Sequence, residues 1–261
     1  MLRFNCPLRW ARGSRKTLEM SGEIENSMAT ANGPRIQPHL LVDFDGTVAV
    51  IDTVDALLSL HAEDAWLEIE TAWIAGKIGS REAMAAQVAL LKLDATELNT
   101  FIDSVVLDPG FSAFVELCRT SQLPVTVVSD GIDHVVTRVL ARHNVPFTVR
   151  ANHLVQTGGE RWALSFPFSA DGCLSGNCKC KAPTAPDSYR ILIGDGRSDF
   201  CAAGTVDLCL AKGKLIDHCR SEGIPHVAFR DFHDVTRILS DLVSGRVSPA
   251  ALTQGKEAFH A

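Results

Sequence analysis

Pairs of carboxylates follow two apolar segments that lie far apart in this chain of 261 residues. Each apolar run is typical of a buried strand, and a buried carboxylate is costly unless it binds a cation or takes part in chemistry. One Asp alone could form a turn, but two acidic strand ends together favour a shared magnesium site. The pairs are Asp43 and Asp45 after residues 40–42, and Asp195 and Asp199 after residues 191–193.

The elements that must position these carboxylates follow from the spacing of the apolar residues. Short apolar runs alternate with segments of helical spacing, which predicts a parallel sheet covered by helices on both faces. Ligands bind at the carboxyl ends of the strands in such sheets, and Asp43, Ser129 and Asp195 all fall at predicted strand ends. The expected strands are 40–42, 125–128, 191–193, 208–210 and 227–229.

Two inserts interrupt this alternation. Residues 52–106 lack strand-like alternation and are rich in helix-forming residues, which predicts a small helical bundle. Its helix starts include Ser80 and a capping sequence at Asp94. Residues 147–180 contain Thr157-Gly158-Gly159 between short apolar stretches, which predicts a hairpin.

Three motifs in this order resemble those of the haloacid dehalogenase superfamily of phosphatases. Residues 43–47 (Asp-x-Asp-Gly-Thr) resemble its first motif, residues 127–131 (Val-Val-Ser-Asp-Gly) its second, and residues 194–199 (Gly-Asp-Gly-x-Ser-Asp) its fourth. The resemblance covers roughly residues 38–233. It implies an α/β fold with a Rossmann-like parallel sheet covered by helices and an inserted helical C1 cap.

The resemblance also implies a domain organisation. Residues 38–51 and 107–245 would form the core, and residues 52–106 the cap that closes over the substrate. Residues 1–37 would be a disordered or targeting extension, and residues 246–261 a C-terminal tail.

The resemblance implies a Mg²⁺-dependent phosphatase that works through an aspartyl-phosphate. Asp43 would be the nucleophile, and Asp45 the general acid and then the base for water. Mg²⁺ would be held by Asp43, the backbone carbonyl of Asp45, and Asp195. Asp199 would fix a metal-bound water or the lysine that the family requires.

Other residues are implied in binding the phosphate and the rest of the substrate. Ser129 would donate to the phosphate together with the backbone N–H groups near Asp130 and Gly131, although a helix N-cap is an alternative role for Ser129. In the predicted cap, Asp52 and Glu82 could face the substrate, and Asp52 could equally be an N-cap. Asp130 replaces the glycine usual in relatives and adds a carboxylate near the phosphate.

The lysine required by the family is expected in the Cys178-Lys179-Cys180-Lys181 segment. Lys181 is the preferred candidate for neutralising the nucleophile and binding the phosphate, and Lys179 is the second. A solvated surface lysine is the ordinary alternative for either.

Three cysteines, Cys173, Cys178 and Cys180, lie within eight residues of one another. They could bind zinc with His153 as a fourth ligand, although a structural zinc site usually contains a C-x2-C spacing. A redox-sensitive loop or a merely structural one remains an alternative.

This loop, preceded by Asn152-His153, is similar to that of the methionine-salvage phosphatases in the phosphoserine-phosphatase-like branch of the superfamily. The similarity implies hydrolysis of 2-hydroxy-3-keto-5-methylthiopentenyl-1-phosphate. Phosphoserine phosphatase is the alternative, with Arg81 or Lys77 as the anchor for a carboxylate, and a phosphotransferase shares the same chemistry. A non-catalytic sensor that uses the cysteines is a further alternative, which the intact Asp43, Asp45 and Asp195 disfavour.

Composition limits the partners and the compartment. A net charge of −6 argues against a nucleic-acid surface, and no apolar run is long enough to span a membrane. The expected partner is a small phosphorylated metabolite, and the sequence does not indicate an oligomeric state. Eight cysteines without a signal-peptide core favour a reducing cytoplasm. Five basic residues precede Glu19, so the extension could be an organelle transit peptide, a disordered tail, or sequence upstream of a true start at Met20 or Met28.

Overall fold

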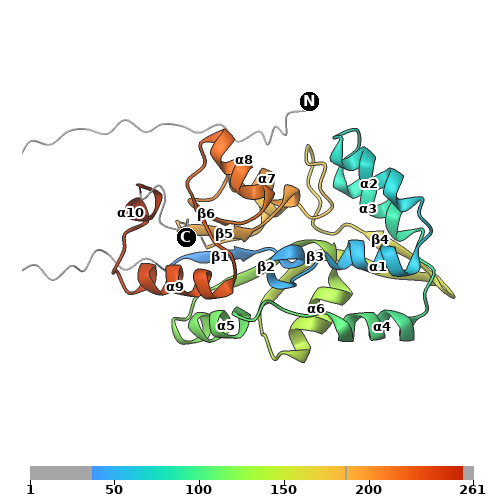
Figure 1. Cartoon of the computed structure of the whole chain (residues 1–261), viewed down its shortest axis with the longest axis horizontal. Coiled ribbons are helices and arrows are strands. Elements are labelled where there is room, and N and C mark those ends of the chain that lie inside the picture. The colour runs from blue at the N-terminus through green and yellow to red at the C-terminus, as the bar shows by residue number, and fades with distance from the viewer. Residues whose placement is uncertain (1–36, 186, 255–261) are drawn as a thin grey trace, which may run out of the picture.

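A computed structural model describes residues 37–185 and 187–254. One seven-stranded sheet runs through it in the order β4-β3-β2-β1-β5-β6-β7, and neighbouring strands are parallel except for β3 and β4 (Figure 1). The α/β prediction is therefore confirmed. The strands are β1 (His39–Val42), β2 (Val125–Ile132), β3 (Thr148–Gly158), β4 (Arg161–Ser165), β5 (Arg190–Gly194), β6 (Leu208–Ala211) and β7 (His226–Ala228).

The strand pairing brings the two acidic segments together. β1 lies between β2 and β5, with Val42 opposite both Val127 and Ile193. The three central strands are almost wholly buried, because apolar side chains cover both faces, as expected for parallel strands. The carboxyl ends of β1, β2 and β5 therefore lie side by side at one edge of the sheet.

Helices cover both faces of the sheet (Figure 1). One layer contains α5 (Phe111–Thr120), α6 (Asp133–Arg142) and α9 (Phe232–Val243), and the other contains α7 (Phe200–Ala203) and α8 (Lys214–Glu222). A large apolar cluster fills the first interface, where the rings of Phe111 and Phe114 stack and Phe232 meets both of them edge-on. A smaller cluster with Leu192 and Leu215 fills the second.

The long insert after β1 is helical, as the sequence predicts. It contains α1 (Thr53–His61), α2 (Trp66–Ile74), α3 (Ser80–Val88) and α4 (Ala95–Ser104), with the expected capping box at Asp94. α2 packs on α3, and α3 contacts β4, whereas α4 contacts α6 of the core. That residues 52–106 act as a separate cap domain stays a prediction.

The second insert forms the expected hairpin, in which β3 and β4 pair around the Gly158-Gly159 turn. Three short helical turns, η1 (Phe44–Val48), η2 (Lys179–Lys181) and η3 (Arg197–Asp199), follow the central strands or precede them. In the predicted C-terminal tail, α10 (Pro249–Gln254) contacts β7. Residues 1–36 of the predicted extension and 255–261 of the tail lie outside the described residues. No helix in the described part is both long and apolar enough to cross a bilayer.

Candidate active site

Three carboxylates meet at the carboxyl ends of β1 and β5. One oxygen from each of Asp43, Asp195 and Asp199 lies within 4.8 Å of the others. Gly46 permits this approach, because its φ is +65° and a Cβ there would lie 2.6 Å from Asp195 Oδ2. The two acidic segments thus meet at one place, and carboxylate oxygens are ligands suited to a divalent cation.

Lys179 is the cation of this cluster. It is fully buried, and its Nζ lies 2.7 Å from Asp43 Oδ1, 2.8 Å from Asp199 Oδ1 and 2.9 Å from Ser198 Oγ. All three ammonium donors therefore have acceptors. Burial alone would lower the pKa of Lys179, but Asp199 and Asp43 outweigh it and raise the pKa, so the lysine stays charged.

The expected preference for Lys181 over Lys179 is wrong. Both residues belong to η2, but Lys181 is exposed, whereas Lys179 points into the carboxylate cluster. The two positions are only two residues apart, so a short helical turn places their side chains in different directions.

Both carboxylate oxygens of Asp199 accept hydrogen bonds, from Lys179 and from the backbone, so neither is free to bind a metal ion. Its Oδ1 accepts from Lys179, and its Oδ2 accepts from the N–H groups of Asp195 at 3.1 Å and Gly196 at 3.2 Å. Of the two positions expected for Asp199, contact with the lysine is the one observed. Asp43 and Asp195 are then the carboxylates best placed to hold a metal ion.

The electrostatics of the cluster leave excess negative charge. Burial raises the pKa of Asp43 well above its usual range, and Asp199 and Asp195 add to this, although Lys179 lowers it. Burial and the nearby Asp199 raise the pKa of Asp195 to about 6. A divalent cation would offset this charge, so the chemistry of the donor set fits a metal ion.

Asp45 lies beside Ser129 at the same edge. Asp45 Oδ2 accepts from Ser129 Oγ at 3.1 Å, while Oδ1 accepts from the backbone N–H of Thr53 at 3.0 Å and from its hydroxyl. Gly131 allows the close approach, because a Cβ there would lie 2.4 Å from Asp45 Oδ2. Ser129 does not cap a helix, since α6 begins with Ile132 as its N-cap.

The side chain of Asp130 joins three segments instead of pointing freely at a phosphate. Its Oδ2 accepts from the hydroxyl of Ser80 in α3, and its Oδ1 accepts from Asn177 N at 2.8 Å and Asn152 Nδ2 at 3.2 Å. These hydrogen bonds lower the pKa of the carboxyl, but burial outweighs them and raises it. The sequence pattern marks Ser80 only as a helix start and does not indicate Asn177.

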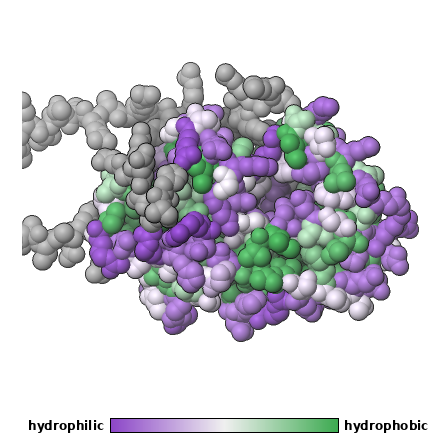
Figure 2. Space-filling view, viewed as in Figure 1, coloured by the Kyte–Doolittle hydropathy of each residue, from purple (hydrophilic) through white to green (hydrophobic). Residues whose placement is uncertain are grey.

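A cleft of about 510 Å³ opens above these residues, between the core and the helical insert. Figure 2 shows a hollow with hydrophilic residues in this region, between α7–α8 and α2–α3. The core side contributes Asp43, Asp45, Asp130, Gly131, Asp195, Arg197 and Lys214, and the insert contributes Asp52, Asp55, Glu70, Trp73, Ile74, Ser80, Met84 and Gln87.

The two cap residues predicted to face the substrate have different positions. Asp52 lines the cleft and also caps α1, with Oδ1 accepting from the N–H groups of Val54 and Asp55 at 2.9 and 3.0 Å. Both roles expected for Asp52 are thus compatible. Glu82 is exposed and does not line the cleft. Glu70, which no sequence pattern indicates, lies in the cleft wall, where its Oε2 accepts from Gln87 Nε2 at 3.0 Å.

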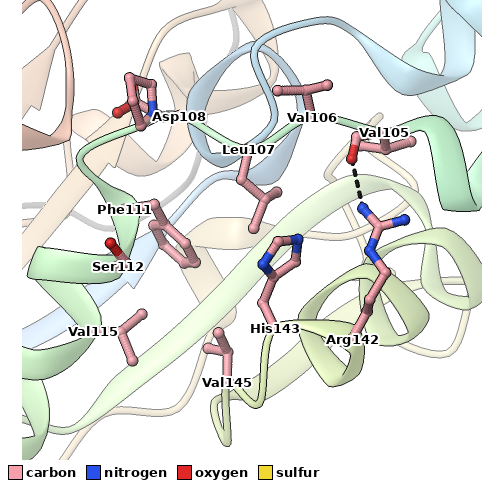
Figure 3. Close-up of a pocket in the computed structure, with 11 residues that line it drawn as sticks. Val105, Val106, Leu107, Asp108, Phe111, Ser112, Val115, Arg142, His143 and Val145 are labelled. Atoms are coloured by element: carbon pink, nitrogen blue, oxygen red, sulfur yellow. Dashed lines mark hydrogen bonds between the residues drawn. The ribbon is translucent and has the colours of Figure 1, made fainter.

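A second pocket of about 630 Å³ lies where residues 105–108 pass α5 and the end of α6 (Figure 3). Its lining is mostly apolar, and Arg142 donates to the Val105 carbonyl across it at 2.6 Å. Its one carboxylate, Asp108, accepts from the N–H groups of Gly110 and Phe232. This pocket therefore lacks the cluster of carboxylates that lies at the sheet edge.

Comparisons with known proteins agree with this geometry. The model of the haloacid dehalogenase-like hydrolase family matches residues 40–204. A 2-hydroxy-3-keto-5-methylthiopentenyl-1-phosphate phosphatase from an Exiguobacterium species is 32% identical over 206 residues, which cover 76% of this chain and 95% of the relative. The enzyme of the same name from Bacillus velezensis is 30% identical over 207 residues, covering 76% and 88%.

Solved structures show the same fold. A phosphoserine phosphatase with an analogue of the phospho-aspartyl intermediate superposes with a TM-score of 0.60 at 19% identity, covering 78% of this chain and 99% of that one. An apo phosphoserine phosphatase gives 0.58 at 20% identity, covering 77% and 98%. The family match, the relatives and the acidic site at the sheet edge lead to one conclusion: the chain belongs to the haloacid dehalogenase-like hydrolases and is a phosphatase of that family.

Proposed function

We propose that this phosphatase hydrolyses 2-hydroxy-3-keto-5-methylthiopentenyl-1-phosphate through a covalent phosphate on Asp43. The main support for this chemistry is the position of the buried Lys179 ammonium, which lies between Asp43 and Asp199 and beside Asp195. A cation fixed at this place neutralises both the nucleophile and the incoming phosphate.

The first step forms the covalent intermediate. An Asp43 oxygen attacks phosphorus, the bond from phosphorus to the ester oxygen breaks, and the carboxyl of Asp45 gives its proton to that leaving oxygen. Asp43 Oδ1 already accepts from Lys179 and from Phe44 N at 2.8 Å, so Oδ2 is the oxygen assigned to the attack. Ser129 and the backbone at Asp130 and Gly131 are the proposed phosphate donors.

The second step releases phosphate. The Asp45 carboxylate takes a proton from water, the water oxygen attacks phosphorus, and the bond to Asp43 breaks to give free phosphate. Asp43, Asp195 and the backbone carbonyl of Asp45 are the proposed ligands of Mg²⁺, which supplies charge neutralisation at the phosphate oxygens when bound. Lys179 and Asp199 hold the nucleophile in position through both steps.

The choice of substrate rests on the cap side of the cleft and on the relatives. Trp73, Ile74 and Met84 give this wall an apolar part that suits a methylthio group. The two cap cations considered as anchors for a phosphoserine carboxylate do not line the cleft. Lys77 is exposed, and Arg81 Nη2 donates to the carbonyls of Cys173 and Ser175 at 2.9 and 3.2 Å. A role in methionine salvage, in the cytoplasm, depends on this substrate and stays a prediction.

Phosphoserine remains the second candidate substrate for one reason. Asp55 and Glu70 on the cap side could bind an ammonium group, and Lys214 across the cleft could bind a carboxylate. This pair of contacts would suit an amino acid better than a thioether.

Phosphate release from a panel of esters, with and without Mg²⁺, tests the proposal. We expect Mg²⁺-dependent hydrolysis with the highest kcat/KM for the methylthio ketone ester, above L-phosphoserine and sugar phosphates. A higher kcat/KM for L-phosphoserine would transfer the assignment to the second candidate. Hydrolysis that survives complete removal of divalent cations would contradict the proposed metal site.

A further inference from the structure

We propose that Cys173, Cys178, Cys180 and Cys201 form a structural zinc site directly behind the active-site lysine. Three of these residues lie in the segment between β4 and β5, and Cys201 lies in α7. The proposal does not depend on the substrate or on the catalytic mechanism.

The four sulfur atoms converge on one place. Cys178 Sγ lies 3.0 Å from Cys180 Sγ. Cys173 interacts by side-chain hydrogen bonds with Cys180 and Cys201, and Cys180 also interacts with Cys201. Cys173 and Cys178 are hydrogen-bonded as well, and Cys178 lies close enough to Cys201 for their charges to interact. Each of the four cysteine side chains therefore interacts with the other three.

This arrangement matches the coordination that zinc prefers. Structural zinc takes four tetrahedral ligands, and a Zn–S bond of about 2.3 Å places the sulfur atoms of a four-cysteine site about 3.8 Å apart. Cys178 Sγ and Cys180 Sγ, now 3.0 Å apart, would need to move outward by less than about 1 Å to reach that separation. The C-x4-C-x-C spacing of the first three cysteines is unusual for such a site. The fourth ligand, Cys201, lies in a helix 21 residues beyond Cys180, so the site depends on the fold and not on a short motif.

A nearby cation would help to balance the charge of a four-thiolate site. The guanidinium of Arg150 interacts electrostatically with Cys178 and stacks on the ring of Phe168 at 4.0 Å. The other buried cysteines are not members of this group: Cys118 packs within the large apolar cluster, and Cys209 and Cys219 pack within the smaller one.

Cys201 takes the place that His153 could have filled. His153 lies on β3, with its Nε2 3.9 Å from Asp133 Oδ2 and its ring edge-on to Phe168. The sequence did not link Cys201 to the other cysteines because the contact forms only when α7 packs on η2.

The position of the site suggests what zinc would do. Lys179 lies between two of the ligands in sequence, and the same segment carries Asn177, which donates to both Asp130 and Ser129. This segment has little regular structure apart from η2. A metal that ties it to α7 would hold Lys179 in place, so the cysteines would act as positioning residues for the active site.

Metal analysis of the full chain tests the proposal. The protein is purified under reducing conditions from zinc-supplemented cells, dialysed against metal-free buffer, and analysed for zinc by mass spectrometry. We expect about one zinc per chain in the wild type and in His153→Gln, and a roughly tenfold lower content in Cys173→Ser and Cys201→Ser, as expected for loss of one ligand. Cys118→Ala, which removes a thiol outside the cluster, should keep the zinc.

Exchange of the wild type with Co²⁺ provides a measurement that needs no variant. Four thiolates should give the strong visible absorption of tetrahedral cobalt and the charge-transfer bands of cobalt–sulfur bonds. A wild type with neither zinc nor this spectrum would overturn the proposal, as would full zinc content in Cys201→Ser. A Cys178–Cys180 disulfide, detected by peptide mass in protein that is isolated under these reducing conditions without zinc, would also overturn it. A chain that binds zinc but hydrolyses no phosphate ester would contradict only the proposed function.

Discussion

The two sides of the cleft use carboxylates in different ways. On the core side, Asp43 and Asp199 are buried and bonded to the same lysine, at the ends of central strands. On the side of the helical insert, called the cap side below, Asp55 and Glu70 are only partly buried, and they lie on helices beside apolar residues such as Met84. The core side is therefore a fixed cluster of charges, and the cap side is a surface on which acidic and apolar side chains are mixed.

This difference divides the work between the two regions. A buried, fully bonded charge cluster keeps one geometry, which suits a reaction whose charges must be stabilised in place. A mixed surface contributes contacts that differ from one ligand to another, which suits discrimination between substrates. We expect core substitutions to abolish turnover with every ester, and cap substitutions to change the ranking of esters.

The largest effect is expected for Asp43→Asn compared with Asp55→Asn. Loss of the nucleophile should reduce kcat at least about 10³-fold with every substrate. Asp55→Asn makes the same chemical change on the cap side and should keep most of the activity with the best substrate. Steady-state phosphate release checks both variants, and comparable losses in the two would remove the distinction between the regions.

A large effect is also expected for Lys179→Met, with Lys181→Met as its matched control. Removing Lys179 leaves two buried carboxylates unpaired, which should cost about 3–5 kcal/mol of unfolding free energy and reduce kcat by roughly 10²-fold or more. Lys181 is exposed, so its variant should stay near the wild type in both respects. Urea unfolding and kinetics test this pair, and a larger loss in Lys181→Met would reverse the assignment of the lysine.

A moderate effect is expected on the cap side for Met84→Ala, with Glu82→Ala as control. Both residues lie on α3, but only Met84 lines the cleft. Losing this apolar contact should lower kcat/KM for the methylthio ester by roughly tenfold, and should affect L-phosphoserine much less. Equal losses for the two esters would show that Met84 does not select the substrate.

The smallest effect is a pH-dependent gain in stability for Asp55→Asn. Burial, with Glu70 and Asp45 nearby, raises the pKa of Asp55 from its ordinary value of 3.8 to about 6. The folded state therefore binds the proton more tightly, and wild-type stability should fall as pH rises from about 4 to 6. Because solvent screens this partly exposed group, we expect the variant to be more stable at pH 7 by no more than about 1 kcal/mol.

Urea unfolding at several pH values measures this difference. It should be largest at pH 7 and should shrink as the pH falls below about 6, because Asp55 then becomes neutral in the folded wild type. A difference that grows on acidification would contradict the sign of the pKa shift.

The same division explains what the sequence could predict. Asp43, Asp45 and Asp195 were recognisable because strand ends of a parallel sheet must meet, so short motifs determine their neighbours. Lys179 was not recognisable as the lysine of the site, because η2 turns within three residues and the sequence does not show in which direction a side chain points. A related reason explains why the sequence did not indicate Cys201, Asn177 and Glu70. The cysteine cluster, the contacts of Asp130 and the cleft wall all form between segments that are far apart in the chain.

The role of Asp43 as nucleophile can be tested by trapping the covalent intermediate. With p-nitrophenyl phosphate as substrate, the leaving group is nitrophenolate, which needs little help from an acid. Asp45→Asn should therefore still form the covalent intermediate, but the attack of water on it lacks the general base. We predict a burst of about one nitrophenolate per active site, followed by slow turnover, with the phosphoryl group on the peptide that contains Asp43 after acid quenching. Turnover without a burst, or with the phosphoryl group on another residue, would contradict the assignment of Asp43 as the nucleophile.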